Sequence, residues 1–161
     1  MGILVVGAGL GRAGMWAALF HVWSNSLTKG SLFLSAGNIR RAAGARTCDE
    51  VSGMTLLTPR SAALFVAGML AVTACPPFSP FFSELGVLKA AIATGHGLGT
   101  VLFLVALLLI FIGMTRLVFA IVDGRPKTPA TGGEKRVRET LGVVLPPAIL
   151  LALAIWLGLA M

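Results

Sequence analysis

The stretch GMLAVTACPPFSPFFSEL (residues 68–85) places three prolines and a glutamate inside an otherwise apolar sequence. A proline removes a backbone N–H donor and clashes with the preceding helical turn, so the PPFSP segment at 76–80 interrupts a helix. Glu84 follows one turn after the interruption, where the dipole and unpaired amides of a new helix favour a carboxylate. The stretch therefore predicts two short helices, at about 60–74 and 81–93, on either side of a break.

The composition of the whole chain is that of a membrane protein. Of its 161 residues, 57% are hydrophobic and only 12% are charged, which is about half the charged share of a soluble domain. Several apolar runs reach or approach the roughly 20 residues that cross a bilayer as a helix, and they lack the alternation of a transmembrane β-barrel. The sequence predicts an all-α integral membrane protein that crosses the membrane several times.

The predicted fold is a bundle of about five transmembrane helices plus a partial helix at the N-terminus, with one helix discontinuous near PPFSP. The helix that precedes the break begins at Pro59, because proline is favoured in the first turn of a helix. Polar segments at 40–59 and 123–140 separate the other helices. In a single membrane domain over 1–161, the predicted helices cover residues 2–11 (partial), 14–38, 60–74, 81–93, 98–122 and 141–160.

The break leaves two topologies open. If the two short helices make one interrupted crossing, both polar segments lie on one side of the membrane, which the positive-inside rule favours. That side would then carry Arg40, Arg41, Arg46, Arg60, Arg125, Lys127, Lys135, Arg136 and Arg138, against Arg12 alone. Length favours two separate crossings, because residues 60–93 would span roughly 51 Å as a helix and a bilayer core is roughly 30 Å thick. We expect two separate crossings.

A polar stripe lies within the helix predicted at 14–38. His21, Asn25 and Lys29 follow one another at steps of four residues, so they form a stripe about 12 Å long on one side of the helix. An ionised lysine at this depth costs several kcal/mol unless it faces the bundle interior, finds a partner or loses its proton. Lys29 and Glu84 are therefore candidate proton-transfer residues.

Structural interpretations of these residues stay open. Lys29 could extend to the membrane surface, His21 could be an ordinary core histidine, and Glu84 could be a capping carboxylate at the membrane surface. The hydroxyls of Thr28 and Ser83 are predicted to support a water-filled relay.

Other functions find no support in the sequence. Cys48 and Cys75 fit no metal or redox spacing, and we expect no cofactor, because ligands for flavin, haem or iron–sulfur clusters are missing from the pattern. The net charge of +7 comes mostly from the two polar segments, which indicates orientation in the membrane and not nucleic-acid binding. The run EKRVRE (134–139) is interpreted as a solvated loop face.

The two motifs together resemble a known family. His21-x3-Asn25-x3-Lys29 followed by LFLSAGNI, and then GMLAVTACPPFSPFFSEL, is similar to the proton-pumping, antiporter-like subunits of respiratory complex I, of group 4 hydrogenases and of multi-subunit Na+/H+ antiporters. GNI and PPFSPFFSE, with glutamate in place of lysine after FFS, most resemble hydrogenase-4 component F of the formate hydrogenlyase type. The resemblance covers nearly the whole chain and implies the C-terminal third of such a subunit.

The resemblance implies roles for three residues: Lys29 as a central relay, Glu84 as the terminal proton site of the broken helix, and His21 as the upstream histidine of the relay. The family often has a second histidine where Asn25 stands, so the relay here would depend more on water. The implied activity is translocation of protons, or of another cation, through a half-channel in the membrane arm of an NADH-quinone oxidoreductase or hydrogenase complex.

The implied location is the inner (plasma) membrane of a prokaryote. The implied partners are lipid, other membrane and peripheral subunits, and the missing N-terminal part of the same subunit. Two alternatives stay open: a non-conducting structural module or truncated fragment that packs with partner subunits, and a bicarbonate-uptake complex that uses the same fold.

Overall fold

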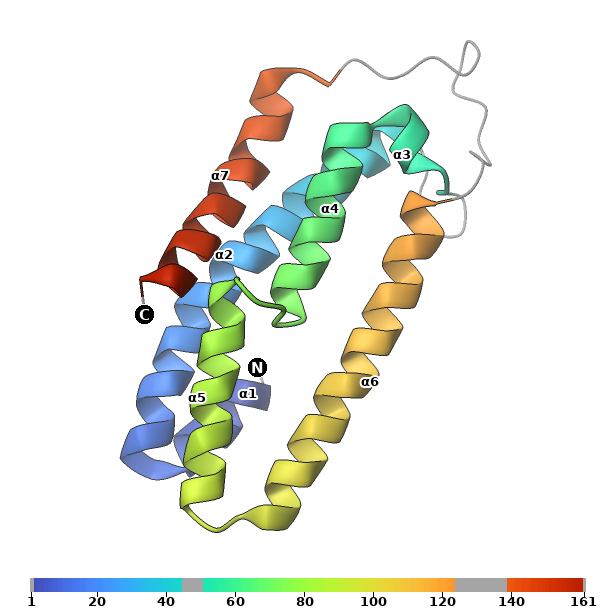
Figure 1. The fold of residues 1–161 in the computed structure, drawn as a ribbon. Coiled ribbons are helices and arrows are strands. Elements are labelled where there is room, and N and C mark those ends of the chain that lie inside the picture. The colour runs from blue at the N-terminus through green and yellow to red at the C-terminus, as the bar shows by residue number, and fades with distance from the viewer. Residues whose placement is uncertain (1, 45–50, 124–138, 161) are drawn as a thin grey trace.

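The computed structural model describes residues 2–44, 51–123 and 139–160, and these ranges contain helices and no strand. The helices are α1 (Gly2–Gly9), α2 (Gly11–Ala43), α3 (Met54–Leu57), α4 (Pro59–Val72), α5 (Ser79–Ala93), α6 (Gly97–Val122) and α7 (Leu141–Leu159). They form an elongated bundle in which α2 and α6 run most of the length (Figure 1). The all-α prediction is confirmed for the described residues, whereas the predicted number of five crossings is not.

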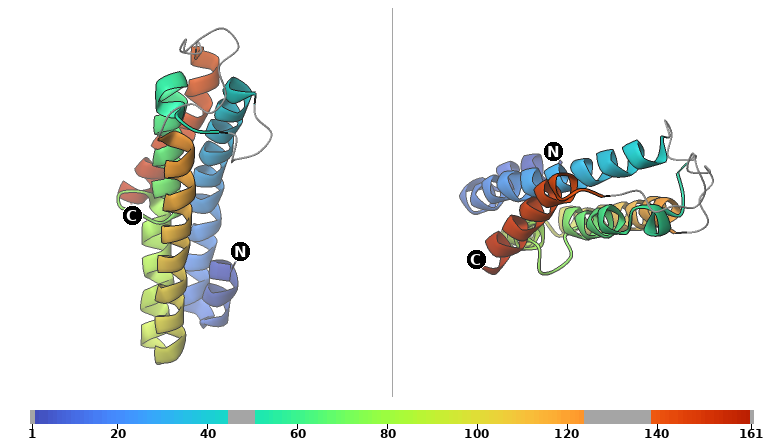
Figure 2. Two further views of the ribbon diagram at one scale, coloured as in Figure 1. Left: turned by 90° about the vertical axis from the view of Figure 1, so that its right-hand side faces the viewer. Right: turned by 90° about the horizontal axis from the view of Figure 1, so that it is seen from above.

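Two layers make up the bundle. Seen from above, α1 and α2 lie in one layer and α4, α5 and α6 in the other, while α7 crosses at an angle (Figure 2). Both α6 and α7 are long and apolar enough to cross a membrane, and almost all of the apolar stretch of α6 is exposed in the isolated chain. Exposed apolar surface on that scale suits a helix that contacts lipid or another membrane helix.

The helices α4 and α5 lie end to end along α2 and together form one interrupted helix (Figure 1). Gly68 of α4 packs on Leu32 in the second half of α2, whereas Gly86 of α5 packs on Ala17 in the first half. This arrangement does not support the expectation of two separate crossings, and the number of crossings stays a prediction. Length does not separate the two topologies, because α2 itself has 33 residues and is about 50 Å long, so the bundle is as long as the interrupted helix.

The described residues that border the two polar segments meet at one end of the bundle. The Gly53 N–H donates to the Asp123 carbonyl at 3.0 Å, and the Thr55 hydroxyl donates to the Val122 carbonyl at 2.7 Å. Both segments therefore leave the bundle at the same end, which is the arrangement that the positive-inside rule favours. Residues 45–50 and 124–138, with six of the nine basic residues considered above, lie outside the described ranges.

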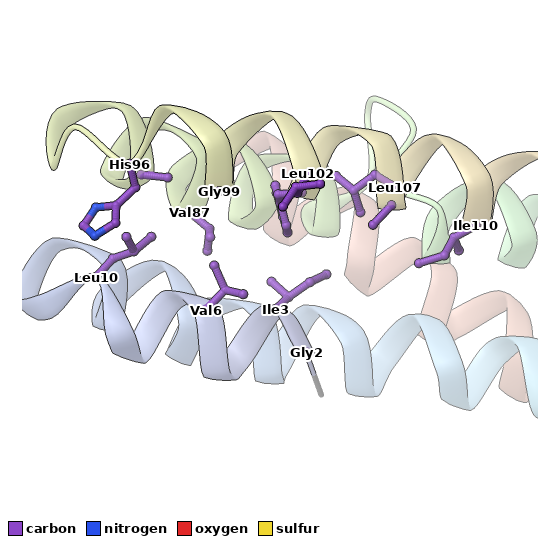
Figure 3. Close-up of a pocket in the computed structure, with 13 residues that line it drawn as sticks. Gly2, Ile3, Val6, Leu10, Val87, His96, Gly99, Leu102, Leu107 and Ile110 are labelled. Carbon is purple, nitrogen blue, oxygen red and sulfur yellow. The ribbon is translucent and has the colours of Figure 1, made fainter.

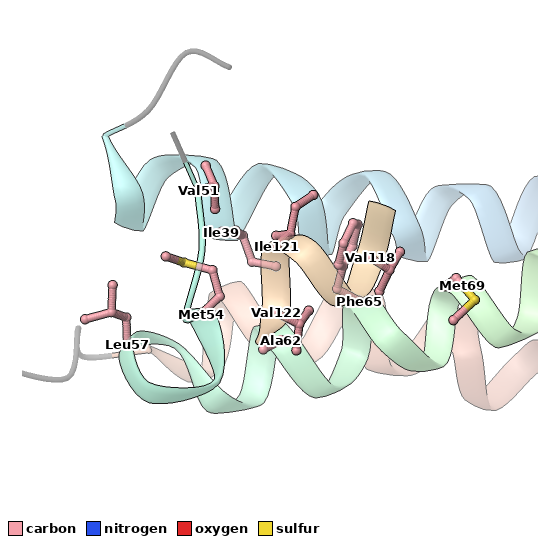
Figure 4. Close-up of a cluster of buried hydrophobic side chains, with 10 residues drawn as sticks. All are labelled: Ile39, Val51, Met54, Leu57, Ala62, Phe65, Met69, Val118, Ile121 and Val122. Atoms are coloured by element: carbon pink, nitrogen blue, oxygen red, sulfur yellow. The ribbon is translucent and has the colours of Figure 1, made fainter. Parts of the chain in front are cut away.

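A hydrophobic cluster closes this end of the bundle (Figure 4). It joins α2, α3, α4 and the last turns of α6, and α3 was not predicted from the sequence. Its buried members are Ile39, Val51, Met54, Leu57, Ala62, Phe65, Met69, Val118, Ile121 and Val122. Because α6 buries side chains here, the cluster holds its C-terminal end against the interrupted helix.

Polar side chains of α2 hold α7 at its prolines. Pro147 has no backbone N–H, so the carbonyl of Val143 loses the helical donor that would stand four residues on. The Asn38 side-chain amide replaces that donor and binds the Val143 carbonyl at 2.8 Å, and the Ser31 hydroxyl binds the Pro147 carbonyl at 2.8 Å. The two bonds explain why an otherwise apolar helix packs on a polar part of α2.

Glu139 is part of the folded structure, in contrast to its interpretation as a solvated loop residue. Its carboxylate accepts the backbone N–H groups of Arg60 at 2.9 Å and of Ser61 at 2.7 Å, so it caps the N-terminus of α4 from the residues that precede α7. The rest of the EKRVRE run, residues 134–138, lies outside the described ranges.

Replacement of Glu139 by alanine is expected to lower stability by about 1 kcal/mol, because two helical N–H groups lose a charged acceptor. The amides of Arg60 and Ser61 should exchange with deuterium about fivefold faster, which mass spectrometry of the purified protein can measure. Glu139→Gln, which keeps one acceptor oxygen, should give a smaller increase. Unchanged exchange in the alanine variant would contradict the capping role.

Candidate functional site

The break between α4 and α5 leaves backbone groups without helical partners. Pro76 and Pro77 have no N–H, so the carbonyls of Val72 and Thr73 lose the donors that would stand four residues on. At the beginning of α5, the hydroxyl of Ser79 is buried and has no hydrogen-bond partner within the described residues. Interrupted helices with free backbone groups at membrane depth are typical places for ion sites.

Glu84 is the sixth residue of α5 and is 7% exposed. It forms no hydrogen bond or ion pair within the part of the chain that the structure describes, and it does not cap α5, so the capping interpretation has no support. It lines a cavity of about 180 Å³ together with Thr73 and Ala74 of the break and Phe103 and Leu107 of α6. A buried carboxylate in an otherwise apolar cavity suits proton binding and release.

The cavity also contains the hydroxyl of Thr73, which was not predicted from the sequence as a site residue. Thr73 donates its hydroxyl proton to the Met69 carbonyl at 2.8 Å, which leaves the oxygen free to accept a hydrogen bond. Its position three residues before the proline pair was the available signal. Thr73 and Glu84 thus offer polar atoms to water in the same cavity.

His21 connects α2 to the beginning of α5. Its Nδ1 atom lies 2.8 Å from the Ser83 hydroxyl oxygen, and both side chains are buried. Ser83 donates its proton to the Pro80 carbonyl at 2.7 Å. Since a hydroxyl has one proton to donate, His21 must be the donor at Nδ1, which leaves Nε2 as the nitrogen that can accept a proton. The structure thus links His21 to the residue that precedes Glu84.

Lys29 is not part of this contact. It is half-buried and forms no hydrogen bond or ion pair within the described residues, and the same holds for the side chain of Asn25. The position of Lys29 along the bundle follows from the contacts of its neighbours on α2. His21 contacts the first turns of α5, and Leu32 contacts the last turns of α4. Lys29 therefore lies level with the break, about 12 Å along the helix from His21.

The most buried face of α2 carries hydroxyls and His21, whereas Asn25 and Lys29 of the predicted stripe are only half-buried. Ser24, Thr28 and Ser35 are fully buried and donate to α2 carbonyls four residues back. With their protons engaged, these hydroxyls can accept hydrogen bonds but cannot pass a proton on without rotating. Small side chains at these buried positions let other helices approach α2 closely, so Thr28 serves packing as well as polarity.

A second cavity, of about 570 Å³, opens between α1, α5 and α6 (Figure 3). Ile3, Val6, Val87 and Leu102 are among its apolar walls, and His96 is the one titratable side chain that lines it. It shares Phe103 and Leu107 with the Glu84 cavity but contains no carboxylate. Among the described residues, no three His, Cys, Asp or Glu side chains gather as metal ligands. Cys75 is unpaired there, and Cys48 lies outside the described ranges.

The sequence places this helical bundle in a known family. Residues 1–113 match the family described as "NADH:quinone oxidoreductase/Mrp antiporter, TM". The chain belongs to this family. The resemblance to antiporter-like subunits of complex I and of Na+/H+ antiporters is thereby confirmed, whereas a particular similarity to hydrogenase-4 stays a prediction. The chain is therefore a membrane protein of the antiporter-like class.

Relatives in this family are subunits of two kinds of complex. The chain is 27% identical to NADH-quinone oxidoreductase subunit N of Desulforudis audaxviator, over 96% of this chain and 33% of that protein. It is 29% identical to Na(+)/H(+) antiporter subunit A1 of Staphylococcus epidermidis, over 91% of this chain and 20% of that protein. It is 33% identical to NADH-quinone oxidoreductase subunit L of Mycobacterium tuberculosis, over 67% of this chain and 17% of that protein. The chain thus spans a third or less of these relatives.

A solved structure has the same fold. A chain in the Mrp complex from Dietzia sp. DQ12-45-1b superposes with a TM-score of 0.85 over 99% of this chain and 37% of its own length, at 23% sequence identity. The end-to-end arrangement of α4 and α5 therefore belongs to a fold that occurs in an assembled antiporter-family complex.

Proposed function

We propose that this chain forms one proton-conducting half-channel of a larger, ion-translocating membrane subunit. The observation that carries the proposal is Glu84, a buried carboxylate without an ion-pair partner in the described chain, beside a helix break. Relatives bear the names of NADH-quinone oxidoreductase and Na(+)/H(+) antiporter subunits, which supports cation translocation within a multi-subunit complex. The chain would cross the inner membrane of a prokaryote four times, by α2, the interrupted helix α4–α5, α6 and α7.

Protons would move between three stations. Glu84 exchanges a proton with water in its cavity, His21 accepts one at Nε2 while Ser83 holds Nδ1, and Lys29 relays it at the level of the break. Water must bridge His21 and Lys29, because about 12 Å separates their positions along α2. Besides Glu84 and Thr73, the side chains lining the cavity are aliphatic or aromatic, so Glu84 is the titratable group that would bind a proton there.

A non-conducting structural module is the second candidate. It is favoured by the engaged hydroxyl protons on the buried face of α2 and by the absence of any contact between Lys29 and the other two stations in the described structure. A module of this kind would keep the helix packing and would not need a titratable side chain at position 29 or 84.

Lys29→Ala separates the two candidates. In membrane vesicles that contain the whole complex, we expect the variant to lower the initial rate of proton uptake at least about tenfold, because the central station cannot bind a proton. Lys89→Ala is the matched control, since Lys89 is exposed on α5, and it should leave the rate unchanged. Assembly is followed in parallel by native electrophoresis. Native rates in an assembled Lys29→Ala complex would leave the structural module as the better conclusion.

A further inference from the structure

We propose that the outer face of α2 docks a membrane helix that presents a carboxylate to Lys29. The outer face is defined here by Trp16, Leu19, Trp23, Ser26 and Phe33. The inference rests on the proposed placement of Lys29 within the membrane but not on proton transfer by Lys29.

Lys29 lacks a counter-charge of its own. No carboxylate pairs with it in the described part of the chain. It lies about 27 Å from the beginning of α2 and about 21 Å from its end, so a side chain about 6 Å long cannot carry the ammonium group to either end. At this depth an unpaired ammonium group facing lipid is strongly unfavourable.

The outer face next to Lys29 is uncovered. Trp16 and Trp23 are each 72% exposed and Phe33 is 71% exposed, whereas α5 and α7 form their hydrogen bonds with His21 and Ser31 on the buried side of α2. On a helical projection, Lys29 stands at the edge of this face, three residues after Ser26 and four before Phe33. A helix seated on the outer face would therefore pass directly beside the ammonium group.

The positive charge of Lys29 indicates what kind of partner covers the outer face of α2. The exposed side of α6 around Leu108 and Leu109 is aliphatic and suits lipid tails. The outer face of α2 combines two tryptophans and a serine with a lysine at its edge. Lipid tails have no hydrogen-bond acceptor or negative charge that could stabilise the ammonium group of that lysine. A carboxylate within about 4–6 Å would stabilise the charged ammonium group, and polar contacts of this kind hold membrane helices together. Relatives of which this chain spans 33% or 20% contain ample further chain for such a helix.

The test is site-specific photo-crosslinking with p-benzoylphenylalanine in native membranes that contain the assembled complex. The cross-linker replaces Trp23 on the outer face or, as the matched control, Leu109, which is 64% exposed on α6. We expect position 23 to form an adduct with an apolar peptide that has an Asp or Glu within two helical turns of the adduct, identified by mass spectrometry. Position 109 should give mainly lipid adducts.

A charge change at Lys29 completes the test. Lys29→Glu should lower the yield at position 23 at least about fivefold, while Lys29→Arg should preserve it. Lipid adducts alone, an adduct with a second copy of this chain, a peptide without an acidic residue, or an unchanged yield in Lys29→Glu would each overturn the proposal. The yield does not depend on transport, so a relay that fails in the vesicle assay leaves this result readable.

Discussion

Glu84→Gln is expected to reduce proton translocation by at least about 100-fold in assembled complexes. Glutamine has nearly the same shape and fits the same cavity beside Thr73 and Phe103, but it cannot bind and release a proton at physiological pH. The bundle should tolerate the change, because the native carboxylate forms no hydrogen bond or ion pair within the described residues that an amide would break. The rate is measured as dye-reported proton uptake in membrane vesicles.

Two controls sharpen this measurement. Glu84→Asp keeps a titratable group but shortens the side chain by one methylene, so we expect a partial loss of rate. Glu139→Gln removes a carboxylate that caps α4 at the bundle end and should leave transport close to native. Native transport in an assembled Glu84→Gln complex would exclude the carboxylate as a proton station.

Gly158→Ala is expected to destabilise the bundle by about 1–3 kcal/mol, because it overpacks the contact between α7 and the break. A Cβ atom at this position would lie 2.6 Å from the Pro77 carbonyl oxygen, 2.9 Å from the Ser79 nitrogen and 3.1 Å from the Phe78 carbonyl carbon. All three are backbone atoms, so no side chain can rotate away and the helix or the break has to shift. We expect a lower melting temperature of the purified complex and less protein in the membrane.

Gly142→Ala is the matched control on the same helix. Nothing lies within 4 Å of a Cβ atom built at position 142, so alanine there should leave stability unchanged or raise it by a few tenths of a kcal/mol through helix propensity. Equal melting temperatures for the two variants would contradict the close packing of α7 on the break. The double variant Gly158→Ala with Glu84→Gln would show whether the effects of the packing and of the carboxylate on the transport rate are independent.

The sequence by itself determined the class of the protein and the approximate places of its main helices. Apolar runs long enough to cross a bilayer are read directly from composition. The interruption at 76–80 follows from proline chemistry, which acts within one helical turn and needs no tertiary contact. Glu84 and Lys29 could also be identified from the sequence, because a charged residue inside an apolar run is a local feature. Their family resemblance followed from motifs that are equally local.

Only the tertiary structure decided how these pieces meet. That α4 and α5 lie end to end along α2 depends on the length of α2 and on contacts such as Gly68 with Leu32, which no local pattern specifies. The contact of His21 with Ser83 joins residues 62 positions apart, and the cap of Glu139 on Arg60 joins residues 79 apart. Such pairs form because burial leaves polar groups in need of partners, and the packed helices determine which partners lie within reach.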